Sequence, residues 1–269
     1  MTTTVAACQL RLDIDDPEGN RRAVVTAVET AAARGATLVV LPELVTSGYV
    51  FADLAEAWSK AEAPDGPTVQ LLTELAAAHG VVVVAGFCER SDGERPYNSL
   101  VVVDRGEVLA VYRKTHLWGT EKDVFAVGDE RAPVVRTSAG TVAAMICYDL
   151  EFPEMVRDVS LRGAQIVVAP SNWPSNSPPP GERAPEVVKA QASAAVNRVF
   201  VLVCDRWGSE RGVDWIGGSV ICDVEGYPVA GPAEGGEVML LAELDLDRAQ
   251  DKTIGAYNEA FTDRRPELY

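Results

Sequence analysis

One stretch of the sequence decides how this chain is interpreted, namely Val142-Ala143-Ala144-Met145-Ile146-Cys147-Tyr148-Asp149-Leu150-Glu151-Phe152-Pro153-Glu154. Its first five residues are an apolar run of the length that is typical of a buried strand. The run ends abruptly in a polar turn, and Pro153 stands where a following helix would begin. Cys147 is therefore predicted at the tip of a strand, beside a cleft. Because buried cysteines are usually inert core residues, the prediction depends on the rest of the sequence.

Two further strand-like runs end in polar residues that could act together with this cysteine. The run from Thr37 to Leu41 is followed by Pro42 and Glu43, and the run over 108–111 is followed closely by Lys114. If the three strands share a sheet and a direction, Glu43, Lys114 and Cys147 converge at one edge of that sheet.

Three motifs of this sequence resemble those of the nitrilase-like carbon–nitrogen hydrolase superfamily, and they stand in the family's order. They are Leu41-Pro42-Glu43-Leu44, Tyr112-Arg113-Lys114-Thr115-His116-Leu117 and Cys147-Tyr148-Asp149-Leu150-Glu151-Phe152-Pro153-Glu154. The resemblance runs almost end to end and implies a catalytic triad of Glu43, Lys114 and Cys147. Glu121 matches a second glutamate of the superfamily that orients the lysine and the substrate amide.

The resemblance also implies a fold class and a domain organisation. The superfamily fold is an α/β structure, a four-layer α-β-β-α sandwich with pseudo-twofold symmetric halves. An internal echo fits two such halves, because Arg34-Gly35-Ala36-Thr37-Leu38-Val39-Val40-Leu41-Pro42 reappears as Arg162-Gly163-Ala164-Gln165-Ile166-Val167-Val168-Ala169-Pro170. We expect one carbon–nitrogen hydrolase domain over 1–269, with a C-terminal tail of about 247–269 that docks on a partner subunit.

Strands and helices are predicted to alternate along the chain. Strands are expected over 5–10, 38–41, 81–87, 97–103 and 108–112, then near 134–136, 141–146, 165–169, 199–204, 216–222 and 237–244. Helices are expected over 16–34, 67–80, about 152–162 and 183–197. Asp104-Arg105-Gly106 is expected to form a hairpin turn, and the segment from Trp173 to Gly181 is expected to be an irregular loop that borders the cleft.

The residue types of the triad suit acyl transfer to water. A free cysteine has a pKa of about 8.5, so it needs a base or a cation to become a nucleophile at neutral pH. Glu43 can accept the thiol proton, protonate the leaving amine and then activate water against a thioester. Lys114 and the backbone N–H of Tyr148 can stabilise the oxyanion. This chemistry requires no cofactor.

The substrate pocket is expected to include Tyr49, Tyr148, Asn172 and Trp173, which follow strands or motifs that carry the chemistry; each could instead be a packing residue. Arg183 and Arg206 are possible partners for a substrate carboxylate, although a surface or structural role is favoured for both. His116 is interpreted as fixing the lysine loop, with a Cys–His dyad as the alternative.

Composition excludes several classes of function. The net charge of −16, from 24 basic and 40 acidic residues, argues against nucleic-acid binding and against an anionic membrane surface. There is no apolar stretch of about 18 residues and no visible signal peptide. Five scattered cysteines favour a reducing cytoplasm, and two histidines without a ligand-like spacing give little support for a metal site.

We therefore expect a cytoplasmic amidase that takes a small aliphatic amide and water. The superfamily's true nitrilases typically carry Trp-Glu after the nucleophile, whereas this chain carries Tyr148-Asp149. The run that starts at Cys147, together with Asp205-Arg206-Trp207-Gly208 and Gly217-Gly218-Ser219 downstream, looks most like small aliphatic amidases, including those that act on ω-amino amides. Hydrolysis of N-carbamoyl amines or of aliphatic nitriles by the same triad remains open, and so does a binding module that kept the fold and lost the chemistry. A homodimer or higher homo-oligomer is expected from the resemblance.

Overall fold

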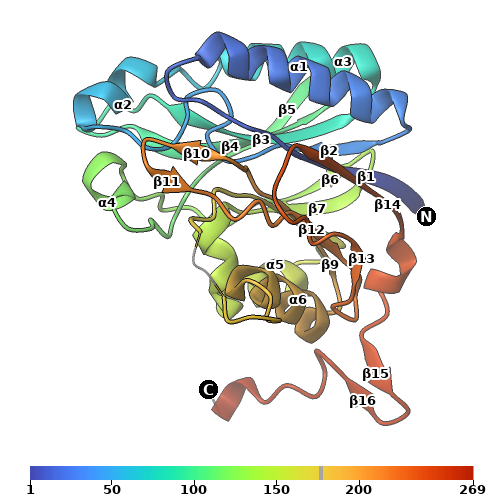
Figure 1. The fold of residues 1–269 in the computed structure, drawn as a ribbon. Helices are drawn as coiled ribbons and strands as arrows, with labels where there is room; N and C mark the ends of the chain where they lie inside the picture. The colour runs from blue at the N-terminus through green and yellow to red at the C-terminus, as the bar shows by residue number, and fades with distance from the viewer. Residues whose placement is uncertain (176–177, 269) are drawn as a thin grey trace.

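Two six-stranded sheets lie face to face in the computed structural model, which describes residues 1–175 and 178–268 (Figure 1). The first sheet has the order β14-β1-β2-β3-β4-β5, with bounds β1 (Thr2–Gln9), β2 (Leu38–Val40), β3 (Val82–Glu89), β4 (Tyr97–Asp104), β5 (Glu107–Arg113) and β14 (Val238–Asp245). The second has the order β13-β12-β9-β8-β7-β6, with bounds β6 (Val134–Thr137), β7 (Gly140–Ala144), β8 (Ile166–Pro170), β9 (Phe200–Cys204), β12 (Val220–Cys222) and β13 (Pro228–Ala230).

Helices cover the outer face of each sheet. The first sheet is covered by α1 (Pro17–Ala33) and α3 (Pro67–His79), and the second by α5 (Pro153–Leu161) and α6 (Pro185–Asn197) (Figure 1). This is the predicted α-β-β-α sandwich. None of the helices among the described residues has the length and apolar character that crossing a membrane would need.

The internal echo in the sequence corresponds to equivalent strands in the two sheets. Each sheet has a centre of three parallel strands, β1-β2-β3 in one and β7-β8-β9 in the other, flanked by antiparallel strands. The two echoed segments supply β2 and β8, which are the middle strands of these trios, and β2 contacts β8 across the sandwich. The pseudo-twofold arrangement of halves follows from this correspondence.

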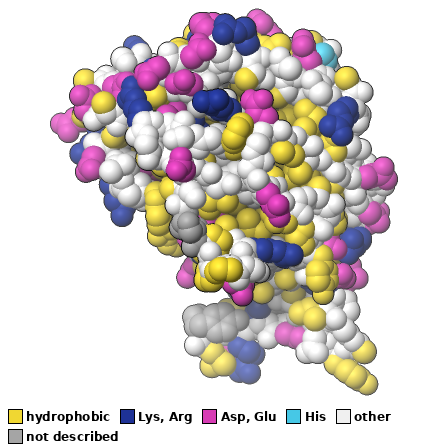
Figure 2. All heavy atoms as spheres, viewed as in Figure 1, with side chains coloured by type: hydrophobic (Ala, Val, Ile, Leu, Met, Phe, Trp, Pro, Cys, Tyr) yellow, Lys and Arg dark blue, Asp and Glu magenta, His cyan; other side chains and the backbone are white. Residues whose placement is uncertain are grey.

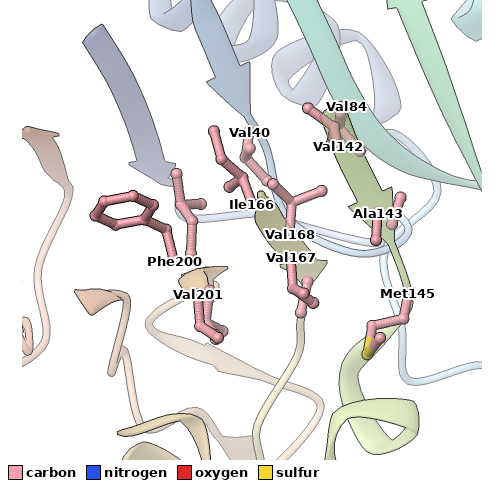
Figure 3. Close-up of a cluster of buried hydrophobic side chains, with 14 of the residues drawn as sticks. Val40, Val84, Val142, Ala143, Met145, Ile166, Val167, Val168, Phe200 and Val201 are labelled. Atoms are coloured by element: carbon pink, nitrogen blue, oxygen red, sulfur yellow. The ribbon is translucent and has the colours of Figure 1, made fainter. Parts of the chain in front are cut away.

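Runs of valine stabilise the sandwich because the strands are buried on both faces. In β3, Val82 and Val84 join the cluster between the two sheets, while Val83 joins the cluster beneath α1 and α3. Figure 3 shows Val40 and Val84 lying over β7 and β8, with Val167 and Met145 pointing away from them. The core between the sheets therefore holds the two halves in register.

Local signals set the helix ends where the sequence predicts them. Asp16 caps α1 by accepting a hydrogen bond from the backbone N–H of Gly19 at 2.8 Å, and Pro17 occupies the first turn. Gly80 ends α3 in the left-handed conformation, with φ at 65°. The turn between β4 and β5 uses Arg105 and Gly106, both with positive φ, as a tight hairpin requires.

The structure also contains elements that the sequence did not predict. They are α2 (Leu54–Lys60), α4 (Glu121–Val124), the hairpin of β10 (Ser209–Glu210) and β11 (Val213–Asp214), strand β13, the hairpin of β15 (Thr253–Gly255) and β16 (Asn258–Glu259), and the 3-10 turns η1 (Cys147–Glu151), η2 (Leu246–Ala249) and η3 (Pro266–Leu268). The strand predicted over 216–222 is shorter, because Gly217, with φ at 62°, bends the chain before β12. In the predicted loop over 173–181, residues 176–177 lie outside the described residues.

Candidate active site

The three motif residues come from strands of both sheets, so the condition that their strands share one sheet does not hold. Glu43 follows β2 and Lys114 follows β5, which are both in the first sheet, whereas Cys147 follows β7 in the second. Apolar runs predict strands but carry no signal for which sheet a strand joins. Because the sheets are stacked, a strand end from each one can contribute to the same buried site.

Lys114 lies between two carboxylates. Its Nζ donates hydrogen bonds of 2.8 Å to Oε1 of Glu43 and to Oε1 of Glu121. The side chains of Lys114 and Glu43 are fully buried and that of Glu121 is nearly so. One ammonium group thus fixes two carboxylates in a site that excludes water.

Cys147 stands in a strained position at the start of η1. Its φ is 48°, a left-handed value that is uncommon for a non-glycine residue, and its side chain is held at the end of β7. The residue is 5% exposed, and its thiol donates a hydrogen bond to the backbone carbonyl of Asn172 at 3.8 Å. The thiol is close enough to the charged cluster for Glu43, Lys114 and Glu121 all to act on its ionisation.

Burial controls the protonation of this cluster. It raises the pKa of Glu43 to about 7, against the opposing effect of the Lys114 ammonium. Burial and the charge of Glu43 raise the pKa of the Cys147 thiol well above its usual range. Burial opposes the charge on Lys114, but Glu121 and Glu43 outweigh it and raise its pKa. The resting site therefore holds a neutral thiol, a protonated lysine and a glutamate that titrates near neutrality.

The two carboxylate oxygens of Glu43 differ in their hydrogen bonding. Its Oε1 accepts hydrogen bonds from Lys114 and from Nδ2 of Asn98, the latter at 2.6 Å. Its Oε2 is buried and has no hydrogen-bond partner among the residues that the structure describes. Asn172 Nδ2 also donates to the backbone carbonyl of Glu43 at 3.1 Å, and the backbone carbonyl of Asn172 accepts the hydrogen bond of the Cys147 thiol, so Asn172 links the two segments.

Asn98 belongs to the site although the sequence analysis did not find it. It lies on β4, and the backbone N–H of Lys114 donates to its carbonyl at 2.8 Å. Its amide also lies 3.4 Å from Oε1 of Glu121. The available signal was a polar Asn98-Ser99 pair inside an otherwise apolar strand.

Asp149 connects the lysine loop to the cysteine turn. Its buried carboxylate accepts hydrogen bonds from the hydroxyl of Tyr112 at 3.0 Å, from the backbone N–H groups of His116 and Ile146, and pairs with Nδ1 of His116 at 2.8 Å. The His116 ring stacks on Phe152, with 3.7 Å between the ring centroids. His116 thus lies in a cross-link between the two loops, which is the geometry expected of a residue that fixes the lysine loop.

The predicted pocket residues occupy different places. The Tyr49 hydroxyl donates to Oε1 of Glu121 at 2.6 Å, and Tyr148 packs edge-on against Trp118 with 4.9 Å between centroids. Asn172 contacts both Glu43 and Cys147, as described above. Trp173 is buried in the same apolar cluster as Cys147. The structure therefore brings Tyr49 and Asn172 to the charged cluster, and the substrate-binding roles of all four residues stay predictions.

Both arginines considered for a substrate carboxylate make contacts within the protein. Arg206 is fully buried, donates to Glu210 at 3.0 Å, and lies over the ring of Trp215 at 4.8 Å from its centroid. Arg183 donates to the side chain of Gln191 on α6 at 2.6 Å. Trp215 was not singled out in the sequence, and its ring meets the ring of Tyr49 edge-on, with 5.1 Å between centroids.

Comparisons with known proteins show which proteins this chain resembles. A family model described as carbon–nitrogen hydrolase matches residues 4–253. The chain is 36% identical to a protein named nitrilase from Pyrococcus abyssi over 98% of each chain, and 31% identical to an N-carbamoylputrescine amidase from Solanum lycopersicum over 99% of this chain and 93% of that one. It is also similar to a solved amidase from Nesterenkonia sp. AN1, which carries an active-site cysteine, with 27% identity, a TM-score of 0.80 and coverage of 99% and 98%.

Proposed function

The chain belongs to the carbon–nitrogen hydrolase family and is a hydrolase of carbon–nitrogen bonds other than peptide bonds, and on that premise we propose that it is an amidase. It would convert a small aliphatic amide into a carboxylic acid and ammonia through a thioester on Cys147. The observation that carries the proposal is the buried cluster in which the Lys114 ammonium bridges Glu43 and Glu121 beside the Cys147 thiol.

The first half of the reaction forms the thioester. Glu43 takes the thiol proton as the sulfur of Cys147 attacks the amide carbon, so no free thiolate is required in the resting enzyme. The oxyanion that forms is stabilised by the ammonium of Lys114 and by the backbone N–H of Tyr148. Glu43 then transfers the proton to the leaving nitrogen, the carbon–nitrogen bond breaks, and ammonia departs.

The second half returns the enzyme to its starting state. Glu43 removes a proton from water as the water oxygen attacks the thioester carbon. The carbon–sulfur bond breaks, the carboxylic acid leaves, and the proton returns to the sulfur. A pKa of about 7 suits Glu43 for both directions of transfer, because a group that titrates near the working pH accepts and donates protons with similar ease.

The other residues of the site have positioning or binding roles in this proposal. Glu121 and Asn98 orient Lys114 and Glu43 through the hydrogen bonds described above. Tyr49, Tyr148, Asn172 and Trp173 are the substrate-binding residues of this proposal, supported for Tyr49 by its contact with Glu121 and for Asn172 by its contacts with Glu43 and the thiol. N-carbamoyl amines are the second candidate substrates, since a relative of 31% identity is named N-carbamoylputrescine amidase.

The test is ammonia release by wild type and by Cys147→Ala from short amides, N-carbamoyl amines and aliphatic nitriles. Release from amides that disappears in Cys147→Ala supports the proposal, and Cys222→Ala on β12 is the matched control that should keep activity. Activity confined to N-carbamoyl compounds or nitriles would replace the substrate class and keep the mechanism. Turnover that survives in Cys147→Ala would exclude Cys147 as the nucleophile.

A further inference from the structure

A cavity of about 300 Å³ opens beside Glu121, and its walls are mostly apolar. They are formed in large part by Tyr49, Phe51, Trp118, Phe125, Val213 and Trp215. These residues come from the loop after Glu43, the segment around α4, and the β10–β11 hairpin, which Figure 1 shows on the same side of the molecule. An apolar cavity of about 150 Å³ can hold benzene. This one therefore has room for a phenyl ring or a branched alkyl chain.

The cavity adjoins the cluster around the thiol. Tyr49 and Trp118 each contact Glu121, through the Tyr49 hydroxyl and through the Trp118 backbone N–H at 2.9 Å. Trp118 also packs against Tyr148, the residue that follows Cys147. A substrate whose amide lies over the thiol would therefore extend its acyl group between these rings.

The charge on the cavity wall is already neutralised. Among the described residues that line the cavity, Glu121 is the single acidic one and none is a lysine or arginine. Both oxygens of Glu121 are occupied, Oε1 by Lys114 and Tyr49 and Oε2 by the Trp118 N–H. A carboxylate on the substrate would lose its water here without gaining a counter-ion, which is costly.

Two arginines lie behind the wall, and each is engaged elsewhere. Arg206 is fully buried, lies 4.8 Å from the ring centroid of Trp215 and pairs with Glu210 through Nη2, while its Nε and Nη1 have no hydrogen-bond partner among the described residues. Arg211 donates to the backbone carbonyl of Val50 and is paired with Glu56 at 2.6 Å. Releasing either arginine toward a substrate would leave a carboxylate without its partner.

Buried hydrogen bonds hold the aromatic walls in place. Glu210 accepts from the backbone N–H groups of Tyr49 and Val50 at 2.8 and 2.7 Å, as well as from Arg206. The Tyr49 ring meets the Trp215 ring edge-on, with 5.1 Å between centroids. The cavity is therefore formed before substrate arrives, and its shape can discriminate between acyl groups.

We propose that this cavity binds the acyl group of the substrate and selects an uncharged amide with an apolar acyl group larger than acetyl. The proposal rests on the amidase function above and narrows it. It predicts that activity rises with apolar acyl size and falls when the end of the acyl chain is charged.

Matched amides test the proposal on the wild-type protein. Acetamide, valeramide and phenylacetamide vary the apolar size, and glutaramate and δ-aminovaleramide carry a charge at the end of the chain. We expect kcat/KM for valeramide and phenylacetamide at least about tenfold above that for acetamide, since added apolar groups in a hydrophobic pocket give factors of about 10 or more. We expect kcat/KM for both charged amides at least about tenfold below that for valeramide.

The outcomes separate this inference from the proposed function. Turnover of acetamide with no gain for the larger amides, or a preference for either charged amide, would overturn the inference and leave the amidase intact. Absence of turnover with every amide would remove the proposed function and this inference with it.

A charge placed in the wall gives a second test. Val213→Arg supplies a cation at a lining position, and Val213→Met is the uncharged control of similar length. The ratio of kcat/KM for glutaramate to that for valeramide should rise at least about tenfold in Val213→Arg and stay within about twofold of wild type in Val213→Met. Because both substrates are measured on one preparation, any loss of folded protein lowers both kcat/KM values equally and leaves their ratio unchanged. An unchanged ratio in Val213→Arg would place the acyl group elsewhere.

Discussion

A single ammonium group organises the chemistry at the residue scale. Lys114 is buried between Glu43 and Glu121, so the cluster carries two acidic groups against one cation. Burial then favours the neutral form of Glu43 and raises its pKa to about 7, while the neighbouring thiol keeps its proton. The cysteine is thus expected to become nucleophilic only while Glu43 is removing its proton.

The pH dependence of the reaction should follow Glu43. Glu43 can accept a proton only when it is ionised, so kcat/KM should fall as the pH drops through about 7, and not near the ordinary glutamate value of 4.5. The same limb should appear in the rate at which iodoacetamide alkylates Cys147. An acid limb centred near the ordinary glutamate value, or alkylation that rises only with the pKa of a free thiol, would contradict this assignment.

The raised pKa of Glu43 also makes the free energy of unfolding depend on pH. Folding favours the protonated carboxyl, so the folded state binds a proton more tightly than the unfolded state between pH 4.5 and about 7. The contribution of Glu43 to the free energy of unfolding is therefore greatest below that window and is lost as the pH rises through it. Glu43→Gln should flatten this part of the stability profile in denaturant titrations, and an unchanged slope would mean that Glu43 does not titrate there.

A substitution at Asn98 distinguishes a residue that positions Glu43 from one that only packs in the core. Its amide hydrogen bond favours the charged form of Glu43 and lowers the pKa of that carboxyl. Asn98→Ala should therefore shift the acid limb of kcat/KM to higher pH, with a fall in kcat of about tenfold or more. The control is Asn197→Ala on α6, whose side-chain amide bonds a carbonyl of its own helix. A lower rate without a shift of the limb would reduce Asn98 to a packing residue.

At the scale of elements, β3 has to pass directly beneath the segment that carries Glu43. A Cβ added at Gly86 would lie 2.5 Å from the backbone nitrogen of Leu44 and 2.7 Å from Cα of Glu43. Backbone cannot yield as a flexible side chain does, so Gly86→Ala should displace Glu43. We expect a loss of stability of about 1–3 kcal/mol and a fall in kcat that exceeds what the lost folded fraction explains.

The matched control is Gly93→Ala, in the loop between β3 and β4. A Cβ at Gly93 meets only the Ser91 hydroxyl, at 3.5 Å, which is an ordinary contact. Its melting temperature and turnover should equal those of wild type. Wild-type turnover in Gly86→Ala would show that the Glu43 segment can shift without cost to the reaction.

The sequence predicted the elements whose ends are marked by capping or turn residues. The capped helices α1 and α3 and the hairpin of β4 and β5 have Asp16, Gly80 and Arg105-Gly106 at the required positions. The short helix α4 and the β10–β11 hairpin have no comparable capping or turn signal in the sequence. They lie where Tyr49 contacts Glu121 of α4 and where its ring meets Trp215, next to the hairpin. The polar Asn98-Ser99 pair marks an unusual position in an apolar strand, but it does not show that Asn98 contacts Glu43. The contacts of Asp149 with the lysine loop are likewise formed between segments distant in sequence, which local pattern does not encode.

At the scale of the whole molecule, the site depends on the packing of two halves. The first sheet supplies Glu43 and Lys114, and the second supplies Cys147 and Asn172. The bonds from Asn172 to Glu43 and from the thiol to Asn172 join these contributions. The family motifs revealed the residues in sequence, whereas their meeting across the sandwich follows from the valine-rich core between the sheets.

The last prediction concerns the C-terminal arm after η2, which extends away from the sandwich (Figures 1 and 2). Its hairpin and end expose apolar side chains, with Tyr257 95%, Leu268 68% and Ile254 65% exposed. Apolar groups gathered on a projecting segment indicate an interaction surface, in line with the expectation that the tail docks on a second copy of this chain.

Removal of residues 251–269, or Tyr257→Ser together with Ile254→Ser, should lower the sedimentation coefficient and make the assembly dissociate on dilution. Tyr227→Ser is the control, since Tyr227 is also exposed, at 67%, but lies on the body of the protein. Sedimentation of the shortened chain in the same oligomeric state as the full chain would show that the arm does not hold subunits together.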